Sequence, residues 1–172
     1  MEKGYIHVYT GNGKGKTTAA FGLAIRAALS GKSVYIGQFV KDMKYNETKI
    51  SDYIENIKIE QFGNGCFIDR LPNESDAFEA NIALNKCRDI LEKGTYDLVI
   101  LDEVTIALYF KLFSVDDLLE VIKLRKENVE VIITGRYAPK ELIEGADLVT
   151  EMREVKHYYN TQGVEARDGI ER

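Results

Sequence analysis

A glycine-rich segment near the N-terminus, residues 10–18, constrains the fold of this chain more than any other feature. Its sequence is TGNGKGKTT, and it lies between the apolar run 5–9 and an amphipathic stretch that continues to residue 29. A strand, a glycine-rich turn, a Lys-Thr pair and a helix in this order typically form a phosphate-binding loop. The amide groups exposed by the glycines converge on phosphate oxygens, and the helix N-terminus adds its positive end. A chance Lys-Thr pair in an ordinary turn is the alternative, and both flanking elements disfavour it.

The loop predicts a role for each of its polar residues. Lys16 is expected to supply a cation to the phosphates and Thr17 a hydroxyl ligand to a magnesium ion. The usual pattern G-x-x-x-x-G-K-[ST] would begin with a glycine where this chain has Thr10, and here an additional cation stands at position 14. The predicted nucleotide-binding residues are Gly11, Asn12, Gly13, Lys14, Gly15, Lys16, Thr17 and Thr18.

Length and charge narrow the class of protein. A chain of 172 residues fits a single domain, residues 1–172, with one sizeable core. The net charge of -5 and the lack of a basic stretch argue against a nucleic-acid partner. No apolar run reaches transmembrane length and no signal-peptide pattern precedes the first strand, so we expect no membrane association and a cytoplasmic location.

Cysteines and histidines give no sign of a metal or redox centre. Cys66 and Cys87 lie in no ligand motif, and His7 and His157 lack clustered partners. Cys87 shares a helical face with Leu91, so we expect it to be a core residue.

Strand-like runs alternate with helical patterns along the chain. We expect strands at residues 5–9, 33–40, 57–62, 96–101, 129–134 and 147–151, and helices at 17–29, 74–92, 104–111, 115–125 and 139–144. This alternation predicts a three-layer α/β fold of the P-loop NTPase (RecA-like) type, with a mostly parallel sheet of about six strands and helices on both faces. Residues 41–46 and 63–73 are expected to be loops that either shape a second substrate site or simply connect elements.

Two acids follow the apolar run 98–101, at the place where P-loop proteins hold magnesium. The predicted metal ligands are Thr17, Asp102 and Glu103. In an ATPase Glu103 would polarise the attacking water, whereas in a transfer without water it would hold the metal or position a substrate. A strand end that merely exposes acids to solvent is the alternative.

Arg136 ends another predicted strand near the same edge of the sheet. Where an added strand separates the two nucleotide motifs, this position often presents a polar residue to the phosphates. The forked donors of Arg136 suit a triphosphate oxygen, and they equally suit an ion pair with Asp102 or Glu103. The predicted catalytic residues are therefore Lys16, Glu103 and Arg136.

Several segments in register resemble the ATP-dependent corrinoid adenosyltransferases. The resemblance covers residues 10–29, 37–41, 98–104, 133–136 and 146–152, extends to 155–157, and continues more loosely over 163–171. It implies transfer of the 5′-deoxyadenosyl group of ATP to the cobalt(I) of a reduced corrinoid, with triphosphate leaving. ATP, Mg²⁺ and the corrinoid would be bound, a flavodoxin-type protein is a candidate reductant, and a homodimer is expected. A P-loop ATPase or kinase, and a non-catalytic nucleotide- or corrinoid-binding paralogue, stay open as alternatives.

The corrinoid side departs from the family pattern more than the nucleotide side. Members commonly have G-F-T-W after the third strand, with aromatic rings thought to wall the lower face of the corrin, whereas this chain has G-C-F-I at 65–68. We expect Phe67, with Ile68 and Phe39, to form an apolar wall that excludes the axial water of cobalt, or else Phe67 packs under its loop. We find no counterpart of the N-terminal extension that members usually carry before the first strand.

Overall fold

The computed structural model describes residues 2–41, 45–63 and 71–171 and contains one sheet of six parallel strands. The strands are β1 (Ile6–Thr10), β2 (Val34–Phe39), β3 (Ile57–Phe62), β4 (Leu98–Asp102), β5 (Glu130–Thr134) and β6 (Leu148–Glu151). Their order in the sheet is β3-β2-β4-β5-β1-β6, and every neighbouring pair is parallel. The predicted α/β fold is confirmed, with a sheet that is parallel throughout.

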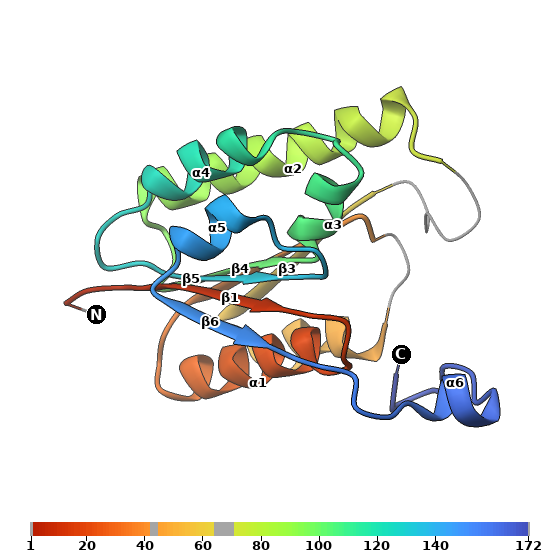
Figure 1. Ribbon diagram of the computed structural model, residues 1–172. Helices are drawn as coiled ribbons and strands as arrows, with labels where there is room; N and C mark the ends of the chain where they lie inside the picture. Colours follow the sequence, from red (N-terminus) through yellow and green to blue (C-terminus); the bar gives the residue numbers. More distant parts are fainter. Residues whose placement is uncertain (1, 42–44, 64–70, 172) are drawn as a thin grey trace.

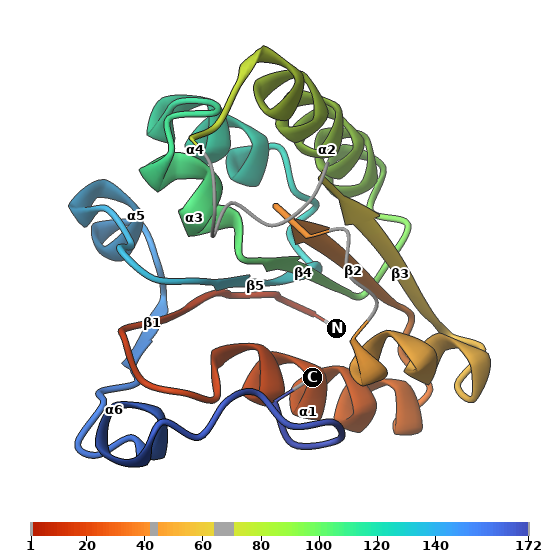
Figure 2. The same ribbon diagram turned by 90° about the vertical axis from the view of Figure 1, so that its right-hand side faces the viewer.

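Helices cover both faces of the sheet and make three layers (Figures 1 and 2). One face carries α1 (Lys16–Leu29) and the 3-10 helix η1 (Asn46–Asp52); the other carries α2 (Glu74–Lys93), α3 (Val104–Tyr109), α4 (Val115–Lys123) and α5 (Lys140–Glu144). The short helix α6 (Tyr158–Gln162) belongs to a tail that leaves the sheet after β6. Within the described residues, none of these helices combines the length and the apolarity that a membrane span needs.

The core is divided by the sheet into two apolar layers. Ala20 and Ala24 of α1 pack on Ile36 and Ile100, while α2 and α4 pack on the opposite sides of the same strands. All five residues of β4 are buried, as expected of a central strand covered on both faces. Cys87 is fully buried in the α2 layer, which confirms it as a core residue; Cys66 lies outside the described residues.

Each predicted strand and helix is present, with ends within two residues of those expected. Ser114 and Asp117 form a reciprocal capping box that starts α4. Sequence reasoning missed η1 and α6, because both are short and their apolar residues form no helical stripe. Residue 46 was expected in a loop and instead begins η1.

The strand order determines which residues meet at the carboxyl edge of the sheet. β5 lies between β1 and β4, so the phosphate loop after β1 and the two acids after β4 are separated by one added strand. The end of β2 lies on the other side of β4. Because parallel strands end at one edge, this topology brings Lys16, Asp102 and Arg136 to the same side of the molecule.

Candidate active site

The phosphate loop is held against the segment that follows β6. The Gly13 amide donates to the Met152 carbonyl at 2.7 Å, and the Met152 amide donates to the Thr10 carbonyl at 2.8 Å. A Cβ atom added at Gly11 or Gly13 would lie 2.3 Å or 2.8 Å from the Met152 carbonyl oxygen, and Gly11 also has a φ of 101°. Only glycine fits at either position. Thr10 is the last residue of β1 and meets no such constraint, which explains the shifted glycines.

Lys16 begins α1 and folds back across the loop. Its Nζ donates to the Gly13 carbonyl at 2.8 Å, and the residue is buried. Burial lowers the pKa of Lys16, and the positive charge of Arg136 lowers it further. An anion bound in the loop would relieve both effects, so the position suits a phosphate oxygen.

Asp102 is the centre of the polar network at the sheet edge, and it is fully buried. Its Oδ1 accepts hydrogen bonds from Thr17 Oγ1 at 2.8 Å and Thr134 Oγ1 at 2.7 Å. Its Oδ2 accepts from Gln38 Nε2 at 2.9 Å and Lys41 Nζ at 3.2 Å. The structure thus brings together Thr17 and Asp102, as predicted. Gln38, Lys41 and Thr134 were not predicted as site residues; the sequence signals for them were their place at or just beyond strand ends and the family resemblance of segments 37–41 and 133–136.

Lys41 adds a second, partly buried cation beside this network. Burial acts to lower the pKa of Lys41, but the adjacent Asp102 carboxylate opposes it and the net pKa is raised. The ammonium group also lies 5.1 Å from the ring centroid of Tyr45 and 3.9 Å from Glu47 Oε1. Lys41 therefore stays charged at neutral pH and faces the same space as Lys16.

Glu103 precedes α3 with a φ of 59°, in the left-handed region that few non-glycine residues adopt. Its amide donates to Thr134 Oγ1 at 3.0 Å, which fixes the turn. Burial raises the pKa of Glu103, and the charge of Asp102 raises it further. Its carboxylate makes no ion pair with any described residue, so it is available to a cation.

A magnesium ion fits the chemistry of these donors. Mg²⁺ in nucleotide sites takes one or two protein oxygen ligands and completes its shell with phosphates and water. Within the described parts of the chain no three His, Cys, Asp or Glu side chains cluster as a separate metal site. Thr17 and Glu103 supply the required hard oxygens, while the oxygens of Asp102 already accept four hydrogen bonds.

Arg136 follows β5 and is exposed on the wall opposite the loop. Its carbonyl accepts a hydrogen bond from Thr105 Oγ1 at 2.6 Å. Its guanidinium forms no ion pair with Asp102, Glu103 or another acid in the part of the chain that the structure describes. Arg136 lines the same cavity as the phosphate loop, so its guanidinium is a candidate donor to a bound phosphate.

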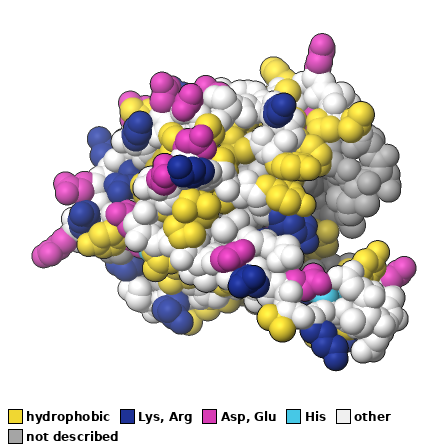
Figure 3. Space-filling model, viewed as in Figure 1, with side chains coloured by type: hydrophobic (Ala, Val, Ile, Leu, Met, Phe, Trp, Pro, Cys, Tyr) yellow, Lys and Arg dark blue, Asp and Glu magenta, His cyan; other side chains and the backbone are white. Residues whose placement is uncertain are grey.

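One cavity of about 1050 Å³ is lined by Lys16, Thr17, Lys41, Glu103 and Arg136, whereas Asp102, Gln38 and Thr134 do not line it. The phosphate loop and α1 line one side, Glu103 and Arg136 line another, and Lys41 with η1 contributes a third. The tail after β6 closes the remaining side, and Figure 3 shows a notch between this tail and the body of the molecule. The volume is large enough for a nucleotide.

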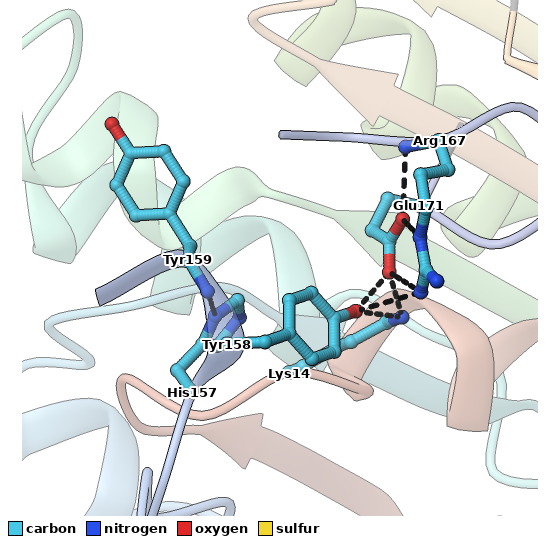
Figure 4. A network of polar contacts seen from close by, with 6 residues as sticks. All are labelled: Lys14, His157, Tyr158, Tyr159, Arg167 and Glu171. Carbon is cyan, nitrogen blue, oxygen red and sulfur yellow. Dashed lines mark hydrogen bonds and ion pairs between the residues drawn. The ribbon is translucent and has the colours of Figure 1, made fainter. Parts of the chain in front are cut away.

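The tail is attached to the phosphate loop by a polar network (Figure 4). Lys14 Nζ lies 2.8 Å from Glu171 Oε1 and 3.2 Å from the Tyr158 hydroxyl. Arg167 also pairs with Glu171, and the Tyr158 hydroxyl donates to the same carboxylate. His157 begins α6, where its Nδ1 accepts a hydrogen bond from the Tyr159 amide.

Comparison with known proteins identifies the family to which this chain belongs. Residues 2–172 match the family model described as ATP:corrinoid adenosyltransferase BtuR/CobO/CobP. The chain belongs to this family. Relatives include the corrinoid adenosyltransferases of Escherichia coli strain K12 (35% identical; 99% of this chain, 86% of the relative) and Salmonella typhimurium (34%; 99% and 86%). The corrinoid adenosyltransferase of Pseudomonas aeruginosa is 34% identical, with coverage of 99% and 84%.

As a member of the ATP:corrinoid adenosyltransferase family, the chain is a transferase whose substrates are ATP and a corrinoid. One residue expected on the corrinoid side lies in the core. Phe39 is fully buried, and its ring packs against Phe113 and Phe62 with centroids 6.0 and 6.3 Å away. Phe39 thus packs in the core, as does every other residue of β2, and its role on the corrinoid side stays a prediction. Phe67 lies outside the described residues.

Proposed function

We propose that this chain transfers the 5′-deoxyadenosyl group of ATP to the cobalt(I) centre of a reduced corrinoid, with Lys16, Arg136 and Glu103 acting on the leaving triphosphate. The observation that carries the proposal is the convergence of these three side chains on one cavity beside the phosphate loop. Family membership supplies the reaction.

The reaction requires stabilisation of the charge that develops on the leaving triphosphate. The electron pair of cobalt(I) attacks the 5′-carbon, and the electrons of the carbon–oxygen bond pass to the departing triphosphate oxygen. Negative charge therefore grows on the leaving group as the bond breaks. Lys16 and Arg136, with the amides of the loop, provide fixed positive groups in a partly enclosed site, where they stabilise that charge more than water does.

The metal strengthens the same effect, since bound Mg²⁺ neutralises charge on the triphosphate. Thr17 Oγ1 and the Glu103 carboxylate would hold it. Asp102 would orient Thr17 through their 2.8 Å hydrogen bond, because a carboxylate has about four acceptor sites and those of Asp102 are taken. No water molecule has to be activated, so Glu103 serves as a ligand rather than as a base.

We further propose that a flavodoxin-type protein supplies the electrons, that the protein forms a homodimer and that it acts in the cytoplasm. We propose no nucleic-acid or membrane partner. These points rest on the family resemblance and on the composition of the chain.

One assay separates this function from its alternatives. The protein is incubated anaerobically with MgATP and a chemically reduced corrinoid, and the products are separated. Triphosphate together with a light-sensitive alkylcobalt product supports the proposal. ADP would instead indicate a kinase or ATPase, and unchanged ATP with bound corrinoid would indicate a carrier. A reaction without corrinoid is the control, because only the transferase requires the acceptor for ATP cleavage.

A further inference from the structure

Two exposed tyrosines stack on each other at the carboxyl edge of the sheet. The rings of Tyr109 and Tyr137 have centroids 4.4 Å apart and planes inclined by 26°. Tyr109 ends α3 and is 56% exposed, while Tyr137 follows β5 and Arg136 and is 61% exposed. An exposed aromatic stack buries little surface of its own, so the core gains little from it.

The backbone holds this pair rigidly. Tyr137 has a φ of 59°, which is strained for an aromatic residue. The turn before it is locked to α3, because Thr105 Oγ1 donates to the Arg136 carbonyl. A Cβ added at Gly135 would lie 2.1 Å from the same Thr105 oxygen, so only glycine permits this approach. The turn at residues 135–137 and α3 are thus held together as one rigid unit, and each contributes one tyrosine.

The same rigid unit also positions two residues of the active site. Glu103 immediately precedes α3, and Arg136 immediately precedes Tyr137; both line the nucleotide cavity. A second cavity of about 530 Å³ is lined by both tyrosines together with Leu108, Phe113 and Val115 among others. The aromatic pair therefore lines an apolar hollow, and Tyr137 directly follows Arg136, which lines the nucleotide cavity.

We propose that Tyr109 and Tyr137 bind the corrin ring of the acceptor and determine its affinity; this inference rests on the proposed function. Cobalt must reach the 5′-carbon of a nucleotide whose phosphates lie on the loop. The macrocycle is much larger than the adenosine it meets, so it extends from the cavity mouth onto the neighbouring surface. Beside Arg136, which lines that cavity, lies Tyr137 as the next residue of the chain, with Tyr109 stacked on it.

The chemistry of the pair matches a corrinoid. A corrin offers a flat conjugated ring with methyl groups on its rim, which suits aromatic faces and an apolar hollow. Its side chains end in amides, which accept hydrogen bonds from tyrosine hydroxyls and from the Lys111 ammonium at the edge of the second cavity. Rigid aromatic side chains lose little conformational freedom when they bind a ligand.

Steady-state kinetics with pre-reduced cob(I)inamide and with cob(I)alamin test the proposal in three variants. Tyr137→Gly removes one ring, and because glycine adopts a positive φ without strain, the backbone is expected to keep its path. Tyr109→Ala removes the other ring. Tyr53→Ala is the matched control, because Tyr53 is 82% exposed and lines neither cavity.

The expected result is a rise of about tenfold in the KM for the corrinoid in Tyr137→Gly and Tyr109→Ala, with the KM for ATP changed less than about twofold. The control variant should match the unaltered protein. Anaerobic equilibrium dialysis with cob(II)inamide and ATP should show the same weakening without turnover. Because cobinamide and cobalamin share the corrin ring, both acceptors should lose affinity alike.

Three results would overturn the inference. The corrinoid KM could be unchanged in both variants, or kcat could fall while both KM values stay constant. A loss seen only when a protein supplies the electrons would assign the pair to a reductant instead. Failure of the proposed function looks different, since the unaltered protein would then form no alkylcobalt product at all.

Discussion

Lys14 Nζ lies 2.8 Å from Glu171 Oε1, although the two residues are 157 positions apart in the chain. Lys14 belongs to the phosphate loop and Glu171 to the end of the tail, so this contact closes one side of the nucleotide cavity. Arg167 and Tyr158 bind the same carboxylate. Arg167, followed by Lys14, lowers the pKa of Glu171. The carboxylate therefore remains charged, and the closure intact, throughout the neutral and mildly acidic range.

Replacing Glu171 by Gln should open the tail. The substitution removes the one negative charge that Lys14 and Arg167 share, and two cations then repel each other beside Tyr158. We expect amide hydrogen exchange over residues 158–170 to accelerate severalfold, while exchange in α1 stays unchanged. Glu144→Gln is the matched control, since it breaks an exposed Lys140–Glu144 pair far from the tail. Equal exchange in Glu171→Gln and the unaltered protein would contradict this role.

Lys16→Ala should reduce kcat/KM by about a hundredfold or more, because removing one fixed positive group from a leaving-group site typically has an effect of this size. The thermal midpoint should change little, as the one hydrogen bond that this side chain makes to a described residue is to the Gly13 carbonyl. Turnover and thermal unfolding are measured on the same preparation, with Lys140→Ala on the exposed helix α5 as the control. Near-normal turnover in Lys16→Ala would mean that the loop does not bind the leaving triphosphate.

Asp102→Asn should destabilise the fold by about 3 kcal/mol, because it removes a buried carboxylate that accepts four hydrogen bonds and is the nearer anion of the partly buried Lys41 ammonium. Urea unfolding measures this loss, and Asp116→Asn on the exposed face of α4 should stay within about 0.5 kcal/mol of the unaltered protein.

A double-mutant cycle isolates the buried pair. If the destabilisation comes from the stranded cation, Lys41→Met should recover part of the stability lost in Asp102→Asn. Additive losses would show that Asp102 stabilises the fold mainly through Thr17, Thr134 and Gln38 instead.

The phosphate loop and the acidic pair Asp102 and Glu103 could be located from the sequence, because each is a local pattern at the end of one strand. Lys16 and Glu103 lie next to the strand or helix that positions them, and topology then brings them together. Phe39 could not be assigned to a face, because all of β2 is buried and strand periodicity carries no information there. The expectation that Phe39 contributes to an apolar wall therefore stays a prediction.

The tail and the Asp102 network were beyond sequence reasoning for a different reason. Glu171 meets Lys14, and Gln38 meets Asp102, across large separations that no local pattern encodes. Tyr109 and Tyr137 likewise stack only because Gly135 lets the turn approach Thr105. Such contacts depend on the loops after the strands, whose paths are not fixed by hydrophobic periodicity.

The magnesium requirement should depend on pH through Glu103. Burial raises the pKa of Glu103, and Asp102 raises it further, so its carboxyl group takes up a proton at a higher pH than an ordinary glutamate. Only the ionised form binds a metal. As pH falls through this raised pKa, the Mg²⁺ concentration for half-maximal activity should therefore rise.

Glu103→Gln tests that assignment, because its amide does not titrate. We expect a Mg²⁺ requirement that is at least several times higher and nearly independent of pH between about 5 and 8. The exposed Glu141→Gln should keep the pH dependence of the unaltered protein. At saturating Mg²⁺ the dependence should disappear from the unaltered protein as well, because the metal competes with the proton for one carboxylate. A pH dependence that persists in Glu103→Gln would contradict the assignment of Glu103 as the metal ligand.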